Sequence, residues 1–216
     1  MTKERVIERI KDKGIVAVVR AENSEKAFDI VEKCIAGGID AIELTFSVPY
    51  AHHVIEDLSR KYGDEIVLGA GTVLDSETAR IALLSGAQYI VSPHFNPEVT
   101  KLCNRYRTAS MAGVLTITEA VTAMEAGVDV LKLFPGDLSG PRFIKDLLKI
   151  LKVRFLGYRL CLQAALMLTT LVNGLKQEPL RLVQVVVSLK VILLLTLKHL
   201  LKTLKLLECK RRHYYG

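Results

Sequence analysis

The stretch from Gly14 to Phe46, GIVAVVRAENSEKAFDIVEKCIAGGIDAIELTF, contains the repeating unit from which the fold can be predicted. Its β-branched run GIVAVVR (14–20) predicts a buried strand. The following segment, SEKAFDIVEKCIAGG, has the apolar spacing of a helix, with Ser24 as N-cap and Gly37 or Gly38 as stop. DAIELTF (40–46) predicts a second strand, so the stretch forms one strand–helix–strand crossover of a parallel sheet.

The same unit recurs as far as about residue 150. Further strands are predicted at 65–72, 88–94, weakly near 108–111, and at 128–134, and helices at 49–63, 75–86, 96–104, 117–127 and 140–152. Six such units in series predict an α/β protein with the TIM (β/α)8 barrel, since eight units fit the full length of 216 residues. In such barrels the chemistry lies at the carboxyl ends of the strands.

Polar residues at those ends form a short list of candidates: Arg20, Glu43 with Thr45, Thr72, Pro93 with His94, Thr116 with Thr118, and Lys132. Lys132 lies between Leu131 and Leu133, where desolvation disfavours an ammonium. A neutral lysine amine attacks carbonyl carbon, and Glu43 at the same barrel mouth would move the accompanying protons. The alternatives stay open at this point: Lys132 and Glu43 as a structural ion pair, and Thr72 as a turn residue.

Composition divides the chain into an expected barrel portion, 1–150, and a basic, Leu-rich tail, 151–216. Residues 1–150 hold 18 Lys and Arg against 21 Asp and Glu, whereas residues 151–216 hold 12 against 2, together with 20 leucines. The apolar runs are too short to span a membrane and the N-terminus has no signal-peptide pattern, so we expect a cytoplasmic protein without a membrane partner. Four widely spaced cysteines without a CxxC pair argue against zinc and a disulfide framework.

Six strings carry a family resemblance: GIVAVVR, IELTFSVP, VLGAGTVL, YIVSPHFNP, TITEAVTAMEAG and VLKLFPGDLSGPRFIK. In this order and spacing they resemble the 2-dehydro-3-deoxy-phosphogluconate aldolase family, also called 4-hydroxy-2-oxoglutarate aldolases. The resemblance implies a class I, Schiff-base aldolase of the Entner–Doudoroff pathway, typically a homotrimer, with no metal or other cofactor and no nucleic-acid partner. It implies cleavage of the phosphorylated six-carbon keto acid to pyruvate and glyceraldehyde 3-phosphate, or of 4-hydroxy-2-oxoglutarate to pyruvate and glyoxylate.

Carried over by motif, the resemblance makes Lys132 the Schiff-base lysine and Glu43 the general acid and base. It places Thr72 and Pro93 in the pyruvyl pocket and Phe134 beside the imine. The planar guanidinium of Arg20 suits the substrate carboxylate, and Thr45 and Thr116 complete the expected substrate-binding set.

Two departures from the family pattern lie within the matching part. Ser47 stands where some members carry an arginine, so part of the anion binding must come from elsewhere. The string TASMAGVLTITE replaces a sequence closer to IPYMPG, so we expect a perturbed fifth strand.

The tail lacks the PTGGV and GxGG strings that would hold the substrate phosphate. Written with permitted codons, residues 160–166 (tta tgc cta cag gcg gcg tta) give MPTGGV in the neighbouring frame. Residues 167–187 continue as NVDNVGEWLKAGAVAVG, one free position and GGG. We therefore interpret residues from about 151 onward as an out-of-frame translation of the aldolase C-terminus, the alternative being a naturally divergent tail.

This interpretation predicts two consequences. Strands seven and eight would be missing, which makes barrel closure uncertain, although LVQVVVSLKVILLL could pair as a non-native strand. Activity would be weak or absent, because the phosphate site would be incomplete. Two other function classes remain open: another phosphate-binding barrel enzyme, such as an isomerase or a thiamin-phosphate-synthase-like protein, and a non-catalytic basic binding protein driven by the tail.

Overall fold

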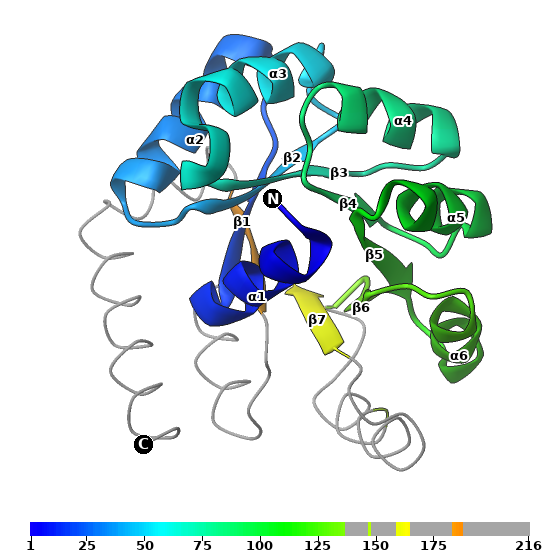
Figure 1. Ribbon diagram of the computed structural model, residues 1–216. Coiled ribbons are helices and arrows are strands. Elements are labelled where there is room, and N and C mark those ends of the chain that lie inside the picture. Colours follow the sequence, from blue (N-terminus) through cyan, green and yellow to red (C-terminus); the bar gives the residue numbers. More distant parts are fainter. Residues whose placement is uncertain (137–146, 148–158, 165–182, 188–216) are drawn as a thin grey trace, which may run out of the picture.

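Eight parallel strands form a closed barrel in the computed structural model of the protein (Figure 1). The structure describes residues 1–136, Leu147, 159–164 and 183–187. The strands are β1 (Ile15–Val19), β2 (Ala41–Thr45), β3 (Val67–Gly71), β4 (Tyr89–Ser92), β5 (Ala109–Val114), β6 (Val130–Leu133), β7 (Arg159–Ala164) and β8 (Val183–Val187). They follow one another around the barrel in chain order, which confirms a TIM-like α/β fold.

Helices connect successive strands from β1 to β6 and cover the outside of this part of the barrel, and one further helix precedes β1 (Figure 1). They are α1 (Lys3–Lys13), α2 (Ser24–Ala36), α3 (Ala51–Tyr62), α4 (Ser76–Leu84), α5 (Pro97–Tyr106) and α6 (Ile117–Glu125), with a short 3-10 turn, η1 (Gly63–Glu65), after α3. The expected N-cap of α2 is corrected by one residue: the side chain of Asn23, not of Ser24, accepts the hydrogen bond from Lys26 N. The helix expected at 140–152 lies outside the described residues, apart from Leu147.

Closure of the barrel corrects an expectation from the sequence. β8 pairs in parallel with β1 over five residue positions, from Ile15↔Val183 to Val19↔Val187, and with β7 on its other side. β7 in turn continues the ladder of β6, with Leu131↔Leu160 and Lys132↔Cys161 in register. Segments of the atypical tail therefore occupy the positions of the last two barrel strands, and β8 is part of the run that the sequence marked as able to pair.

Side chains alternate between the barrel interior and the helix layer, as the period of a strand requires. On β2, Ile42 and Leu44 pack outward with residues of α2 and α3, whereas Ala41 packs inward with residues of other strands. β5 follows the same rule over six buried residues, Ala109–Val114. The expected perturbation of this strand is therefore wrong: its small side chains and Gly113 are compatible with regular pairing to β4 and β6.

Helix α1, which the sequence patterns did not single out, closes the amino-terminal end of the barrel. Val6, Ile7 and Ile10 belong to the same buried cluster as interior residues of β1 to β6. In the view of Figure 1, α1 lies across the middle of the ring of strands. Burial of its apolar face explains why a helix precedes β1.

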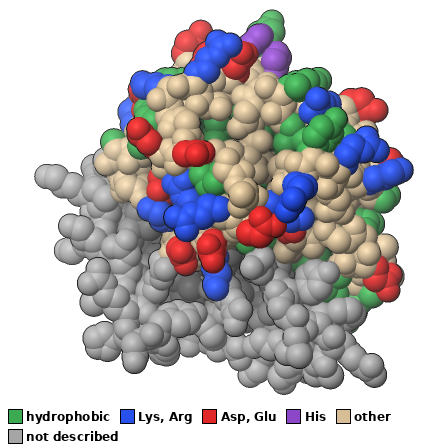
Figure 2. Space-filling view, viewed as in Figure 1, with side chains coloured by type: hydrophobic (Ala, Val, Ile, Leu, Met, Phe, Trp, Pro, Cys, Tyr) green, Lys and Arg blue, Asp and Glu red, His purple; other side chains and the backbone are tan. Residues whose placement is uncertain are grey.

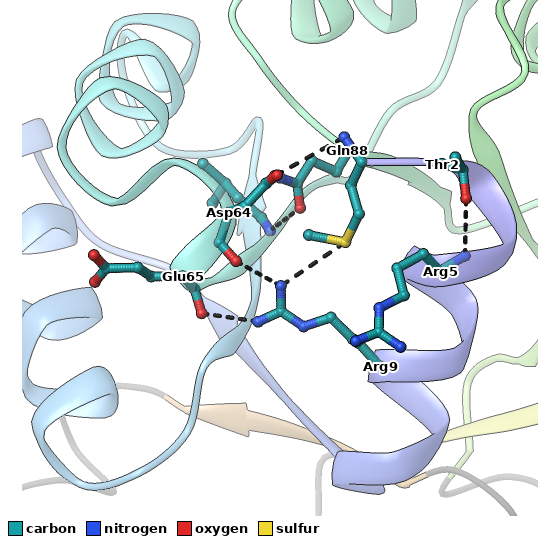
Figure 3. Close-up of polar contacts among 8 residues, drawn as sticks. Thr2, Arg5, Arg9, Asp64, Glu65 and Gln88 are labelled. Carbon is teal, nitrogen blue, oxygen red and sulfur yellow. Dashed lines mark hydrogen bonds and ion pairs between the residues drawn. The ribbon is translucent and has the colours of Figure 1, made fainter.

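A polar contact at the edge of this cluster fixes α1 to the loop before β3. The Arg9 guanidinium donates to the backbone oxygens of Asp64 and Glu65, at 2.6 and 2.8 Å, and Gln88 donates to the Asp64 carboxylate (Figure 3). Acidic and basic side chains are interspersed on the face of the molecule shown in Figure 2. Among the described residues, no helix combines the length and apolar character needed to cross a membrane.

Candidate active site

Lys132 and Glu43 meet in the barrel interior although β6 and β2 lie on opposite sides of the closed ring. The distance from Lys132 Nζ to Glu43 Oε1 is 3.8 Å, and their side chains are 4% and 1% exposed. Neighbouring residues on each strand pack outward, Leu131 and Leu133 against α6 and Ile42 and Leu44 against α2 and α3. Alternation therefore directs both charged groups into the barrel, where little water competes for them.

Phe134 lies next to the lysine. Its ring centroid is 5.2 Å from Lys132 Nζ, within the range of a cation–π contact. The Phe134 backbone N–H donates to Val114 O at 3.2 Å, which holds the residue after β6 against β5, and the Phe134–Pro135 peptide bond is cis. The half-buried ring thus forms an apolar wall beside the amine.

Thr45 connects the carboxyl ends of β1 and β2. Its hydroxyl donates to Val19 O at 3.0 Å and lies 2.7 Å from the hydroxyl of Ser47. Because the single Thr45 proton is used on Val19, Ser47 is the donor in the second contact. The Val19 carbonyl belongs to the peptide that leads into Arg20, so Thr45 holds the backbone at the base of that exposed arginine.

Thr72 and Pro93 directly follow β3 and β4 and are both half-buried. Thr72 has a φ of 57°, a left-handed conformation that a β-branched residue rarely adopts. Such backbone strain is common at functional sites. The structure thus places Thr72 directly after β3 in a strained backbone conformation.

Gly113 was not among the candidates from the sequence, although it lies in close contact with the backbone after β4. It pairs in register with Lys132, and a Cβ added to it would lie 2.0 Å from the carbonyl oxygen of Pro93. Only glycine lets the backbone after β4 approach this close to β5. A glycine inside a predicted strand signals such an approach, and this signal could have identified it.

Thr116 is the one predicted site residue whose hydroxyl the structure engages in a helix cap. It is exposed and forms a capping box with Glu119: its hydroxyl accepts from Glu119 N, and the Glu119 carboxylate accepts from Thr116 N. Hydrogen bonds from the backbone N–H groups of Leu115 and Thr116 lower the pKa of Glu119. This capping role accounts for Thr116 without a substrate.

The two cysteines whose side chains are described are buried free thiols outside this site. Burial raises the pKa of Cys34 to about 11 and that of Cys103 to about 12. Both are therefore protonated and unreactive at neutral pH. Among the described residues, no group of three or more His, Cys, Asp or Glu side chains is arranged to hold a metal ion.

Comparison with known proteins assigns the family. The sequence model of the family described as KDPG and KHG aldolase matches residues 6–161, which extend from α1 into β7. The chain belongs to this family. Its members are carbon–carbon lyases, and the matched range contains every residue of the site described above.

Curated relatives agree with the family. The chain is 36% identical over 137 residues to the 2-dehydro-3-deoxy-6-phosphogalactonate aldolase of Escherichia coli, a match that covers 63% of this chain and 67% of the relative. It is 36% identical to the 2-dehydro-3-deoxy-phosphogluconate aldolase of Treponema pallidum, over 62% of this chain and 64% of the relative. The matches thus span about two thirds of these relatives' length.

A solved structure shows the same fold. The native KDPGal structure superposes with a TM-score of 0.71 at 29% identity, covering 79% of this chain and 81% of that chain. This structural match extends over more of the chain than the curated sequence matches do.

Proposed function

We propose that this aldolase-family chain forms a Schiff base through Lys132, with Glu43 as the proton-transfer group. The observation that supports this most strongly is the Lys132–Glu43 pair, 3.8 Å apart and almost completely buried in the barrel interior. An amine that attacks a carbonyl carbon and a carboxylate that moves protons beside it are the two groups that imine chemistry needs. Arg20, at the mouth above them, would bind the keto-acid carboxylate.

The proposed reaction breaks the C3–C4 bond of the keto acid. The neutral Lys132 amine adds to the C2 carbonyl carbon of the keto acid, and loss of water from the adduct gives a protonated imine. Glu43 takes the proton of the C4 hydroxyl; the C3–C4 bond breaks, the aldehyde leaves, and the electron pair passes to the imine nitrogen as an enamine. The protonated Glu43 then returns its proton to C3, and water hydrolyses the resulting imine, which releases pyruvate and restores both the lysine amine and the Glu43 carboxylate.

The substrate class follows from the relatives. Their names specify 2-dehydro-3-deoxy-6-phosphogalactonate and 2-dehydro-3-deoxy-phosphogluconate, which share the keto-acid end and the phosphate and differ in stereochemistry between them. We assign this chain to phosphorylated six-carbon 2-keto-3-deoxy acids, with the KDPG reaction yielding pyruvate and glyceraldehyde 3-phosphate, and to 4-hydroxy-2-oxoglutarate as the smaller alternative. Ser47 in place of an arginine leaves Arg20 as the guanidinium near the pyruvyl end.

The tail limits this activity in our proposal. The PTGGV and GxGG strings are absent from the sequence, and the segments that follow β7 and β8 lie outside the described residues. An out-of-frame translation from about residue 151 explains the missing strings, the 20 leucines and the positive charge of this part together. The pyruvyl half of the site, built from β1 to β6, would then work while phosphate binding is weak.

Assembly and location remain part of the proposal. We expect a cytoplasmic homotrimer, and exposed large apolar side chains such as Leu84, which is 70% exposed, are candidates for contact with a second copy. Static light scattering on a size-exclusion column measures the mass of the assembly. A monomeric mass would contradict the trimer without affecting the chemistry.

Borohydride reduction in the presence of pyruvate tests the activity. Hydride adds to the imine carbon and fixes pyruvate on the lysine as a stable secondary amine, which peptide mapping by mass spectrometry locates. We expect the adduct on Lys132 and its loss in Lys132→Met, whereas Lys101→Met, which changes an exposed lysine of α5, keeps it. A folded wild-type chain without an adduct contradicts the proposed function.

A further inference from the structure

We propose that β3 and Tyr89 form a support for Glu43, and that Gly71 and Tyr89 are positioning residues for its proton transfer. The inference rests on the proposed function, in which Glu43 moves the protons. It concerns how a flexible carboxylate side chain is held at one place in the barrel. Two glycines on β3 and one phenol on β4 are the parts of this support.

The Tyr89 hydroxyl is bound to the backbone immediately before Glu43. In the strand register Glu43 pairs with Gly69, and Gly69 pairs with Tyr89, so the three lie side by side on β2, β3 and β4. A Cβ on Gly69 would lie 2.3 Å from the Tyr89 ring, so the ring occupies the space above this glycine. The fully buried phenol thereby crosses β3 and donates to Ile42 O on β2 at 2.8 Å.

This hydrogen bond acts on the peptide that joins Ile42 to Glu43. A buried phenol needs a partner, and its hydroxyl fixes the backbone from which the carboxylate extends. The ring itself fills the interior on the amino-terminal side of Glu43. Tyr89 thus restrains Glu43 without being placed as a contact to the substrate.

Gly71 leaves room for the side chain of Glu43. It lies two residues after Gly69 and therefore also faces the interior. A Cβ at this position would lie 2.1 Å from Glu43 Oε1 and 2.6 Å from its Cγ. The carboxylate occupies the space that any other residue's side chain would take, and from there it reaches Lys132.

Positioning matters because proton transfer falls steeply when a group is displaced, by as much as about 10²-fold for roughly 1 Å. A carboxylate that moved off Gly71 would still leave the Lys132 amine intact. Loss of the support should therefore impair proton transfer at the C3 carbon of bound pyruvate more than formation of the imine. These two steps can be measured separately, and neither needs the phosphate site.

The test uses the full chain with pyruvate alone. Exchange of the pyruvate methyl protons in D2O, followed by NMR, reports the proton transfer, and the yield of borohydride adduct at saturating pyruvate reports the imine. We expect Tyr89→Phe to slow the exchange at least tenfold with an adduct yield within twofold of wild type. Gly71→Ala should slow it further, and its thermal melting curve shows whether it folds.

Tyr62→Phe is the matched control, because it removes a phenol that donates to Glu32 at 3.0 Å on the outside of the barrel. We expect its exchange rate to equal that of wild type. Exchange within twofold of wild type in folded Tyr89→Phe, or an equal fall in exchange and adduct yield, overturns the positioning role. A wild-type chain with neither adduct nor exchange instead overturns the proposed function, and the inference with it.

Discussion

Strands β1 to β6 and strands β7 and β8 belong to one barrel but differ in what their sequences retain. The first six lie inside the part that matches the aldolase family, and they supply Glu43 and Lys132. The match ends at residue 161, within β7, and neither the PTGGV nor the GxGG string is present beyond it. Nevertheless β8 pairs with β1 along five positions.

The difference shows that closing the barrel and completing the phosphate site require different features of the sequence. A parallel ladder needs backbone hydrogen bonds and residues of suitable β-propensity, and VQVVV (183–187) has this composition. A phosphate site needs glycines that let backbone N–H groups approach the anion. Strands β7 and β8 can therefore complete the barrel, while strands β1 to β6 carry the residues proposed for the chemistry.

The largest expected effect comes from the first region. Glu43→Gln keeps the size of the side chain but removes the proton acceptor, so we expect kcat for cleavage to fall by roughly 10²–10⁴-fold. Steady-state kinetics with coupled detection of pyruvate measures it. Glu32→Gln, on the outer helix α2, serves as control, and a kcat for Glu43→Gln within tenfold of wild type contradicts the proton-transfer role.

Restoring the other reading frame changes the second region and leaves β1 to β6 as they are. A chain recoded to read MPTGGV from residue 160 and onward in that frame should gain roughly 10²-fold or more in kcat/KM for the phosphorylated substrate, since about two charge-assisted hydrogen bonds would be regained. The pyruvate-exchange rate should change much less. An equal gain in both rates would mean that the tail damages the pyruvyl half as well, against the division proposed here.

Added side-chain volume in the interior of strands β1 to β6 is expected to destabilise the fold. Gly69→Ala places a methyl group against the fully buried Tyr89 ring, so we expect the free energy of unfolding to fall by about 1–3 kcal/mol. Urea denaturation measures the change. Gly37→Ala, at the end of α2 with a φ of −80°, should cost less; equal costs would contradict the close contact at Gly69.

The smallest effect is expected at the cap of α6. Thr116→Ala should lower the free energy of unfolding by about 1 kcal/mol and leave KM unchanged. Because the pKa of Glu119 is lowered in the folded state, its contribution is present above the pKa of the unfolded chain and is lost as the pH falls through the lowered value. Chemical denaturation at neutral and acidic pH follows this loss; a raised KM would restore Thr116 to the substrate site.

Local sequence patterns were sufficient to predict most strands and helices between β1 and β6. Short β-branched runs located β1 to β4 and β6 to within about two residues at each end. The helices predicted to begin at 75 and 96 start within one residue of α4 and α5, whose N-caps are Asp75 and Asn96. The pattern was weaker for β5, whose run ASMAGV has small residues and only one β-branched one. Tertiary pairing with β4 and β6 overrides that weak local preference.

Sequence patterns alone predicted strands β1 to β6, helices α2 to α6, the family, and the two residues expected to carry the chemistry. Only the tertiary structure decided that Lys132 and Glu43 meet across the barrel at 3.8 Å and that Tyr89 crosses a glycine to reach the backbone beside Glu43. It also decided that tail segments close the ring. Hydrophobic periodicity and helix caps depend on residues a few positions apart in the sequence. These contacts join residues tens of positions apart, so they form only when the strands assemble into one closed sheet.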